Sequence, residues 1–139
     1  MKRKVYYAVI DTNVLVSSQL KRDSVPGWII DQVLIGKIIP LLNQEIINEY
    51  YDVLTRNKFG FSDRQIEGLI GKIARRGLFL DRSKTEELFI DNDDIVFYEI
   101  VLTAQNYHYS YLITGNIKHF PNKKFVVTPV EMKNIIEGA

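Results

Sequence analysis

Apolar and polar residues along this chain form two alternating patterns. Short runs in which almost every residue is apolar indicate strands covered on both faces, and longer segments with apolar residues at helical spacing indicate helices that bury one side. We expect strands over residues 5–10, 38–42, 109–114 and 123–127, and either a short strand or an extended connection over residues 78–80. We expect helices over residues 25–35, 44–55, 63–76 and 95–105, and a last helix from residue 129.

Capping residues support the expected helix ends. Small polar side chains accept hydrogen bonds from the free N–H groups of a first helical turn, and a glycine can end a helix. Such signals are Ser24 before Pro26, Gly36, Asn43, and the capping boxes Ser62–Gln65 and Thr128–Glu131. Pro40 lacks a backbone N–H, and we therefore expect the strand over residues 38–42 to lie at a sheet edge.

The alternation of strands and helices predicts a three-layer α/β/α fold. A mostly parallel sheet would lie between helices on both of its faces. The 139 residues fit one core, and no linker, repeat or low-complexity segment divides them. We therefore expect a single α/β domain over residues 1–139.

Composition and charge mainly exclude classes of function. Apolar residues make up 46% and charged residues 25% of the chain, as in ordinary globular proteins, and no apolar run is long enough to span a membrane. The net charge of +1 favours no class of partner, so any basic surface must be local. The absence of cysteine excludes disulfides and thiolate metal sites, and it is compatible with the cytoplasm, where we expect the protein.

Asp11 directly follows the first expected strand. In open α/β sheets ligands bind beyond the carboxyl ends of the strands, so chemistry is expected at this position. An equally simple interpretation is that Asp11 starts a turn or caps a helix. This stretch alone leaves both interpretations open.

Three other polar side chains fall where this architecture brings distant segments together. Asn116 follows the strand over residues 109–114, and Asp94 opens a helix, where the helix dipole favours a carboxylate. Glu49 lies at the margin of the apolar stripe of its helix, so its side chain can reach toward the end of the sheet. A surface glutamate beside a core face is the common alternative for Glu49.

Carboxylates that share a cleft repel one another. At an effective dielectric near 20 and a separation of about 5 Å, each pair costs roughly 3 kcal/mol, so three of them require a cation or raised pKa values. Oxygen ligands suit a hard ion such as Mg²⁺ or Mn²⁺. Such an ion activates water and stabilises charge on a phosphoryl group, so Asp11, Glu49 and Asp94 together indicate phosphodiester hydrolysis.

Motifs for other chemistries are missing from the sequence. It contains neither G-x-G-x-x-G after a strand nor G-x-x-x-x-G-K-[ST], and His108 and His119 lack the spacing of a zinc site. His119 can reach a phosphate, but a partly exposed loop residue is the more common role. A phospho-receiver domain needs an acceptor aspartate after a central strand, for which Asp81 is a poor fit, and no lysine follows the strand over residues 109–114 until Lys118.

Four segments resemble the motifs of PIN-domain nucleases. They are Asp11 to Val16, the run Ile46 to Arg56 with Glu49 near its start, Asp94 to Glu99, and Leu112 to Asn116 followed by His119-Phe120-Pro121. The resemblance extends from about Tyr6 to Thr128. It is closest to the VapC-like toxins of bacterial toxin–antitoxin pairs.

The resemblance implies a PIN-like parallel sheet, an Mg²⁺- or Mn²⁺-dependent ribonuclease, and a cognate antitoxin as partner. It carries metal-binding and catalytic roles onto Asp11, Glu49 and Asp94, and Asp94 is preferred over Asp93 because it directly precedes the apolar helical run. Where the family more often has an aspartate, this chain has Asn116, which can orient a water or a phosphate oxygen but brings no charge. A catalytically weak or inactive PIN-fold module that binds RNA or protein is therefore the alternative function.

Other side chains extend the prediction to substrate and partners. We expect single-stranded or looped RNA, because exposed bases and a bent backbone fit a cleft more easily than a duplex does. Glu99 either supplements the acidic site or forms a structural hydrogen bond. Three lysines near the fourth motif are candidates for binding the RNA backbone and are also typical of a solvated surface: Lys118, Lys123 and Lys124. Three aromatic residues suit either a core or a protein interface such as that of a homodimer: Trp28, Tyr50 and Tyr51.

Overall fold

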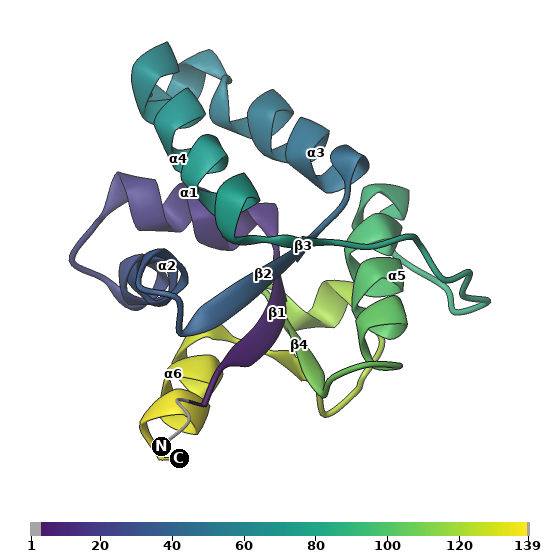
Figure 1. The fold of residues 1–139 in the computed structure, drawn as a ribbon. Coiled ribbons are helices and arrows are strands. Elements are labelled where there is room, and N and C mark those ends of the chain that lie inside the picture. The colour runs from purple at the N-terminus through teal and green to yellow at the C-terminus, as the bar shows by residue number, and fades with distance from the viewer. Residues whose placement is uncertain (1–3, 139) are drawn as a thin grey trace.

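A five-stranded sheet forms the centre of the structure, a computed structural model that describes residues 4–138 (Figure 1). Every neighbouring pair of strands is parallel, which confirms the predicted type of sheet. Residues 1–3 and 139, which the expected domain also includes, lie outside the described part. The strands, in the sheet order β3-β2-β1-β4-β5, are β1 (Tyr6–Ile10), β2 (Ile38–Leu42), β3 (Leu78–Phe79), β4 (Ser110–Ile113) and β5 (Val126–Val127).

Helices cover both faces of this sheet, as predicted. On one side α5 (Ile95–Ala104) packs on β1, β2 and β4, and on the other side α2 (Val25–Leu34) and α4 (Asp63–Arg76) pack on β2 (Figure 1). Across residues 4–138, no helix is long and apolar enough to cross a membrane. The remaining helices are α1 (Thr12–Leu20), α3 (Gln44–Leu54) and α6 (Pro129–Glu137), and short 3-10 turns are η1 (Asn57–Phe59), η2 (Asn92–Asp94) and η3 (Ile117–His119).

The expected caps are present at the starts of α2, α3, α4 and α6. At each of these starts a side-chain oxygen accepts a hydrogen bond from a backbone N–H of the first turn. Thr128 and Glu131 form the complete capping box that the sequence predicts. The box predicted at Ser62 is only half formed: Ser62 Oγ accepts a hydrogen bond from Gln65 N, while the Gln65 side chain donates to Gln19 Oε1 at 3.2 Å.

Helix α1 is the element that the apolar pattern does not predict. Its apolar residues Val14, Leu15 and Val16 are consecutive, so they point to different sides of the helix and form no stripe with helical spacing. All three are buried, because α1 packs between α2 and α3. Burial on several sides thus removes the periodic signal on which the expectation of a helix would depend.

Strand β2 lies between β1 and β3, so the expectation that Pro40 marks a sheet edge is wrong. Alternate residues of a strand direct their backbone groups to the same neighbour, and the carbonyl of Leu42 accepts a hydrogen bond from Leu80 N on the β3 side. Pro40 faces the same side, but the pairing with β3 begins only at Leu41 and Leu78. The missing N–H therefore costs no hydrogen bond between strands.

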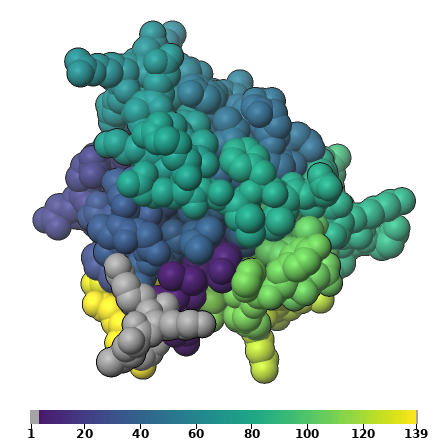
Figure 2. Space-filling model, viewed as in Figure 1, coloured from purple at the N-terminus to yellow at the C-terminus, as the bar shows by residue number. Residues whose placement is uncertain are grey.

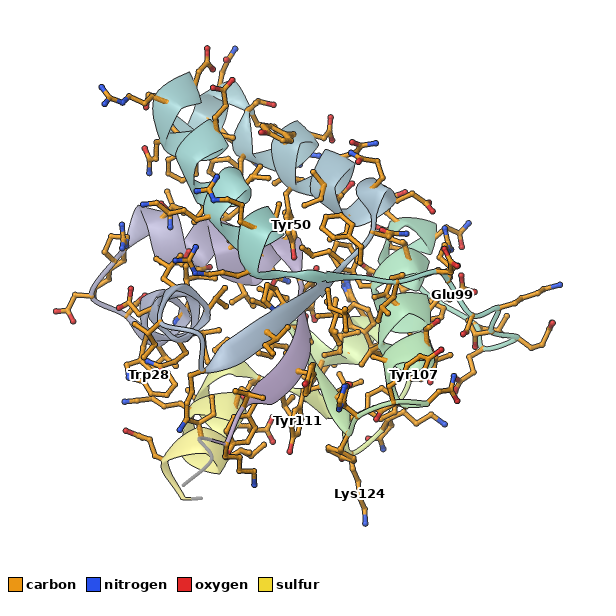
Figure 3. All side chains as sticks on the ribbon, in the orientation of Figure 1. Trp28, Tyr50, Glu99, Tyr107, Tyr111 and Lys124 are labelled. Atoms are coloured by element: carbon orange, nitrogen blue, oxygen red, sulfur yellow. The ribbon has the colours of Figure 1, made fainter. Side chains whose placement is uncertain are left out.

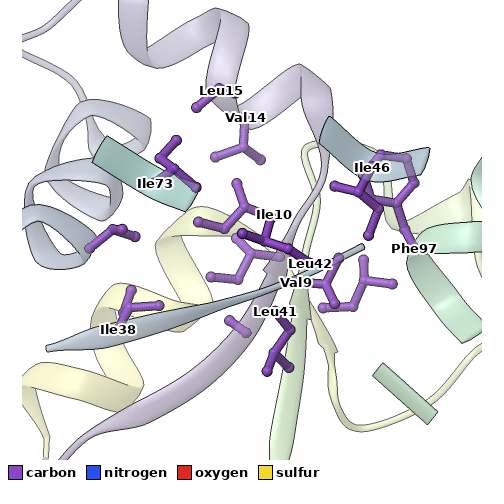
Figure 4. Packing of buried hydrophobic residues seen from close by; sticks show 14 of the residues in the cluster. Val9, Ile10, Val14, Leu15, Ile38, Leu41, Leu42, Ile46, Ile73 and Phe97 are labelled. Atoms are coloured by element: carbon purple, nitrogen blue, oxygen red, sulfur yellow. The ribbon is translucent and has the colours of Figure 1, made fainter. Parts of the chain in front are cut away.

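The hydrophobic core surrounds β1 and β2 (Figure 4). Val9, Ile10, Leu41 and Leu42 are each exposed by 1% or less. Both faces of these strands are covered, which agrees with the continuous apolar runs in their sequences. Since β1 is the middle strand, its carboxyl end opens at the middle of one end of the sheet. That end is called the carboxyl end of the sheet below.

Tyr50 belongs to this core and not to an external interface. Its side chain points from α3 toward β1, and its hydroxyl donates a hydrogen bond of 2.6 Å to the carbonyl oxygen of Ile10 (Figure 3). This bond fixes the position of α3 beside the carboxyl end of β1. Trp28 and Tyr51 are half-buried.

Replacing Tyr50 with phenylalanine should lower the free energy of unfolding by about 1 kcal/mol, because it removes a buried hydrogen bond and keeps the ring. Urea denaturation followed by circular dichroism measures the change. Tyr51→Phe is the matched control, since Tyr51 lies on the same helix and its hydroxyl has no hydrogen-bond partner among residues 4–138. Equal losses in the two variants would contradict a specific role for the bond between Tyr50 and Ile10.

Candidate active site

Asp11 lies at the carboxyl end of β1 and is only 6% exposed. Its Oδ1 accepts a hydrogen bond of 2.8 Å from the backbone N–H of Thr12, so it caps α1. Its Oδ2 accepts bonds of 2.7 Å from Thr114 Oγ1 and 3.2 Å from Asn13 Nδ2. The two interpretations that the sequence leaves open are thus compatible, because Asp11 caps a helix at the position where ligands bind in open α/β sheets.

Hydrogen bonds join the fourth motif, which ends at Asn116, to the first motif, which begins at Asp11. Gly115 N donates to Asn13 Oδ1 at 3.0 Å, and Asn116 N donates to Thr114 Oγ1 at 3.0 Å. Since Thr114 Oγ1 itself donates to Asp11, a single hydroxyl separates the backbone of Asn116 from the Asp11 carboxylate. The structure therefore brings Asp11 and Asn116 together.

Asp94 ends η2 and is the residue before α5, with its side chain 16% exposed. Its Oδ2 is buried and has no hydrogen-bond partner among the described residues, although His119 Nδ1 lies 3.4 Å away. The pKa of Asp94 is raised to about 6, first by burial and then by the charges of Asp11 and Asp91, against the opposing effect of His119. Asp94 thus lies within electrostatic reach of Asp11.

Glu49 lies on α3 and is partly exposed. Desolvation raises the pKa of Glu49, and the charges of Asp93, Asp52 and Asp11 raise it further, while Arg56 lowers it. Burial also raises the pKa of Asp11, against the lowering effect of its hydrogen bonds from Thr114 and Thr12. Glu49 and Asp94 therefore both lie close enough to Asp11 for its charge to raise their pKa, and each of the three carboxyls binds a proton more tightly than in water.

His119 lies beside the candidate site through a contact with Asp94 that the sequence does not predict. The sequence predicts a partly exposed loop residue, and the His119 side chain is indeed 40% exposed. Its position in η3 also brings it against Asp94, and its charge lowers the pKa of both Asp94 and Asp11. The contact between His119 and Asp94 joins segments that are distant in the chain, so no local sequence pattern predicts it.

The three lysines proposed for RNA binding occupy different places. Lys118 is exposed in η3, two residues after Asn116. Lys123 forms an ion pair with Glu87 at 3.2 Å. Lys124 precedes β5 and projects from the opposite end of the sheet, away from the carboxyl end (Figure 3). Of the three lysines, only Lys118 is a near neighbour of Asn116 along the chain. The binding role of each lysine stays a prediction.

Glu99 forms structural hydrogen bonds on the outer side of α5 (Figure 3). Its carboxylate accepts bonds of 2.7 Å from Arg82 Nε and 2.9 Å from Thr85 N. Arg82 also forms an ion pair of 2.7 Å with Glu45. These contacts fasten the segment between β3 and α5, whose middle projects from the molecule (Figure 2). Of the two roles that the sequence leaves open for Glu99, the contacts favour the structural one.

Asp81 follows β3, which lies at one edge of the sheet. A phospho-receiver domain requires its acceptor aspartate after a central strand, so this alternative is wrong for the observed topology. The only central strand that an aspartate directly follows within residues 4–138 is β1, and that aspartate is Asp11.

The donor set of the site suits a hard cation in type and charge. Its side chains offer carboxylate and amide oxygens, and the buried Asp94 Oδ2 lacks the partner that a ligand would provide. Among residues 4–138, however, no three His, Cys, Asp or Glu side chains lie close enough together to form a ready cluster of protein ligands. Direct ligation by all three carboxylates would require side-chain movement, whereas ligation through water would not.

Asp94 should make the stability of the protein depend on pH. Its pKa rises from an ordinary 3.8 to about 6 on folding, so its favourable contribution is complete below pH 4 and is lost as pH rises through 6. Asp94→Asn should exceed the wild type in unfolding free energy by about 1–2 kcal/mol at pH 7, with little difference at pH 4. Urea denaturation across this range measures it. The exposed Asp23, changed to Asn, is the control, and a pH-independent difference for Asp94→Asn would contradict the assignment.

Comparison with known proteins identifies the family of this chain. A family model of the PIN domain matches residues 7–118, which include Asp11, Glu49, Asp94 and Asn116. A search of curated proteins and a search of solved structures each find no significant match. PIN domains are typically nucleases and usually use divalent metals. The match covers most of the chain and all but one strand of the sheet, and the chain therefore belongs to the PIN-domain family.

Proposed function

We propose that this protein is a metal-dependent endoribonuclease that hydrolyses phosphodiester bonds in RNA. The observation that supports this most is that Glu49 and Asp94 both lie within electrostatic reach of Asp11, which directly follows β1, and that the pKa of each of these carboxyls is raised. A protein gains nothing in stability by gathering carboxylates that repel one another. Such an arrangement is typical of functional sites, where a cation or a proton compensates the charge.

Each residue has a distinct role in this proposal. Asp11, Glu49 and Asp94 would hold Mg²⁺ or Mn²⁺, directly or through water. The bound ion would supply Lewis-acid activation of water and would neutralise charge at the scissile phosphate. Asn116 would orient a water or a phosphate oxygen through its amide, and Thr114 and Asn13 keep the Asp11 carboxylate in a fixed orientation. Lys118 would contribute to binding the backbone of single-stranded or looped RNA.

We further propose that the nuclease is the toxin of a toxin–antitoxin pair that acts in the cytoplasm as a single domain. The cognate antitoxin would be its protein partner, and the half-buried Trp28 and Tyr51 are candidate contacts with it or with a second copy in a homodimer. The neighbouring reading frame provides a direct test. A short adjacent gene for a DNA-binding protein that co-purifies with this chain supports the proposal, and an isolated gene counts against it.

A non-catalytic PIN-fold module that binds RNA or protein is the second candidate function. It is favoured by Asn116, which lacks the charge that the family more often has at this position, and by the absence of a ready three-ligand cluster within residues 4–138. A panel of RNAs incubated with and without Mn²⁺ separates the two functions. Metal-dependent cleavage that is lost in Asp11→Asn supports the nuclease, and binding without cleavage supports the module.

Removing either of the other two carboxylates should abolish metal-dependent cleavage of RNA. We expect Glu49→Gln and Asp94→Asn to reduce the rate by at least about 100-fold while circular dichroism shows an intact fold, because each removes a carboxylate that would hold the metal ion which stabilises the reacting phosphate. Glu67→Gln on the exposed side of α4 is the matched control and should keep full activity. Full activity in Glu49→Gln or Asp94→Asn would remove that residue from the proposed site.

Asn116→Asp should have opposite effects with and without metal. The change is almost isosteric and adds one charge, which within a few ångströms of a divalent ion contributes on the order of 1–3 kcal/mol after screening. Affinity for Mn²⁺ should then rise about tenfold in calorimetric titration. Without metal, the additional carboxylate repels Asp11 and Asp94, so the melting temperature should fall. If affinity and melting temperature both stay unchanged, Asn116 does not belong to the site.

A further inference from the structure

A pocket of about 320 Å³ opens beside Asn116 at the carboxyl end of the sheet. Its walls come from Val14 and Ser17 of α1, Pro26 of α2, Pro129 of α6, and the turn at residues 115–116. This volume lies at the lower end of the range for small-molecule sites, which suits one ring system better than a large ligand. None of the three carboxylates of the proposed site lines the pocket, so its occupant is a separate question.

The pocket is rigidly connected to Asp11. The amide of Asn13 donates to Asp11 Oδ2 and accepts from Gly115 N, so both of its ends are engaged. At position 115 an added Cβ would lie 3.3 Å from Asn13 Oδ1, which explains why a glycine fits this turn. A ligand in the pocket would therefore be held at a fixed position relative to the Asp11 carboxylate.

The pocket combines apolar walls with two unengaged polar side chains. Val14, Pro26 and Pro129 provide the apolar surface. Within residues 4–138 neither the Ser17 hydroxyl nor the Asn116 side-chain amide has a hydrogen-bond partner. No charged side chain lines the pocket, so it offers nothing to neutralise a phosphate. Its chemistry suits a neutral, flat ring with both donors and acceptors on its edge.

We propose that this pocket binds the nucleobase of the nucleotide next to the scissile phosphate, and so gives the enzyme a base preference at one position of the RNA. The inference rests on the proposed function. Asn116 lines the pocket and is linked through Thr114 to Asp11, so a phosphate at Asp11 and a base in the pocket belong to adjacent groups of one strand. Single-stranded RNA can turn such a base outward, and the Ser17 hydroxyl can hydrogen-bond to its edge as donor or acceptor.

Filling the pocket is the first test. Ser17 is exposed on α1, so Ser17→Leu should fold normally while placing a larger side chain in the pocket. With a randomised single-stranded RNA library, we expect loss of base preference at one position next to the cut. For a preferred RNA we expect KM to rise on the order of tenfold, the equivalent of about 1.4 kcal/mol of lost contacts with one base, with little change in kcat or in Mn²⁺ affinity.

Asn134→Leu is the matched control for this variant, since Asn134 is exposed on α6 and does not line the pocket. It should keep the wild-type base preference and KM. If Ser17→Leu also keeps both, the pocket does not bind a base of the RNA, while the nuclease proposal stands. Loss of Mn²⁺ affinity in Ser17→Leu would also overturn the inference, because the variant would then disturb the acidic site itself.

Binding of free nucleosides tests the inference without cleavage. Uridine, cytidine, adenosine and guanosine are titrated into the metal-free protein, and backbone amide shifts are followed by NMR, with inorganic phosphate as the control. At least one nucleoside should shift the amides of Ser17, Gly115 and Asn116, phosphate should not, and Ser17→Leu should remove the effect. Shifts confined to other surfaces, or none with any nucleoside, overturn the inference. If the wild type cleaves no RNA, the nuclease proposal fails and this titration alone decides whether the pocket binds a base.

Discussion

Burial of the Asp11 carboxylate is the interaction on which the carboxyl end of the sheet depends. A buried charge is tolerated only when its oxygens are well satisfied, and here they receive bonds from Thr12, Asn13 and Thr114. These bonds start α1, join the ends of β1 and β4, and position the turn that carries Asn116. The requirement to satisfy one carboxylate thus organises much of the local geometry of the proposed site.

The sequence predicts those parts of the fold that depend on local patterns. The strands around the core have continuous apolar runs because both faces of the sheet are covered, and the caps at Asn43 and Thr128 use short contacts within one turn. The position of β2 and the existence of α1 could not be predicted in the same way. Pro40 costs no hydrogen bond between strands because the pairing of β2 with β3 begins only at the next residue, Leu41. Helix α1 shows no periodic apolar stripe because it is buried on several sides.

The candidate site likewise has parts that the sequence predicts and parts that it does not. Asp11 and Asn116 could be placed from the sequence because the carboxyl ends of parallel strands lie at one end of a sheet. The contact of His119 with Asp94, the hydrogen bond from Tyr50 to Ile10 and the projection of Lys124 from the opposite end depend on how helices and loops return to the sheet. No spacing in the chain encodes these contacts, so they required the tertiary structure.

The hydrogen bond between Thr114 and Asp11 joins the beginning of the chain to a strand that is synthesised close to its end. During translation, the residues of β1 leave the ribosome before β4 is made. Until then the Asp11 carboxylate is hydrated and lacks its hydrogen bond from Thr114. Contacts so distant along the chain form late, because a large loop must close first. The hydrogen bonds around Asp11 can therefore be completed only after nearly the whole chain has been synthesised.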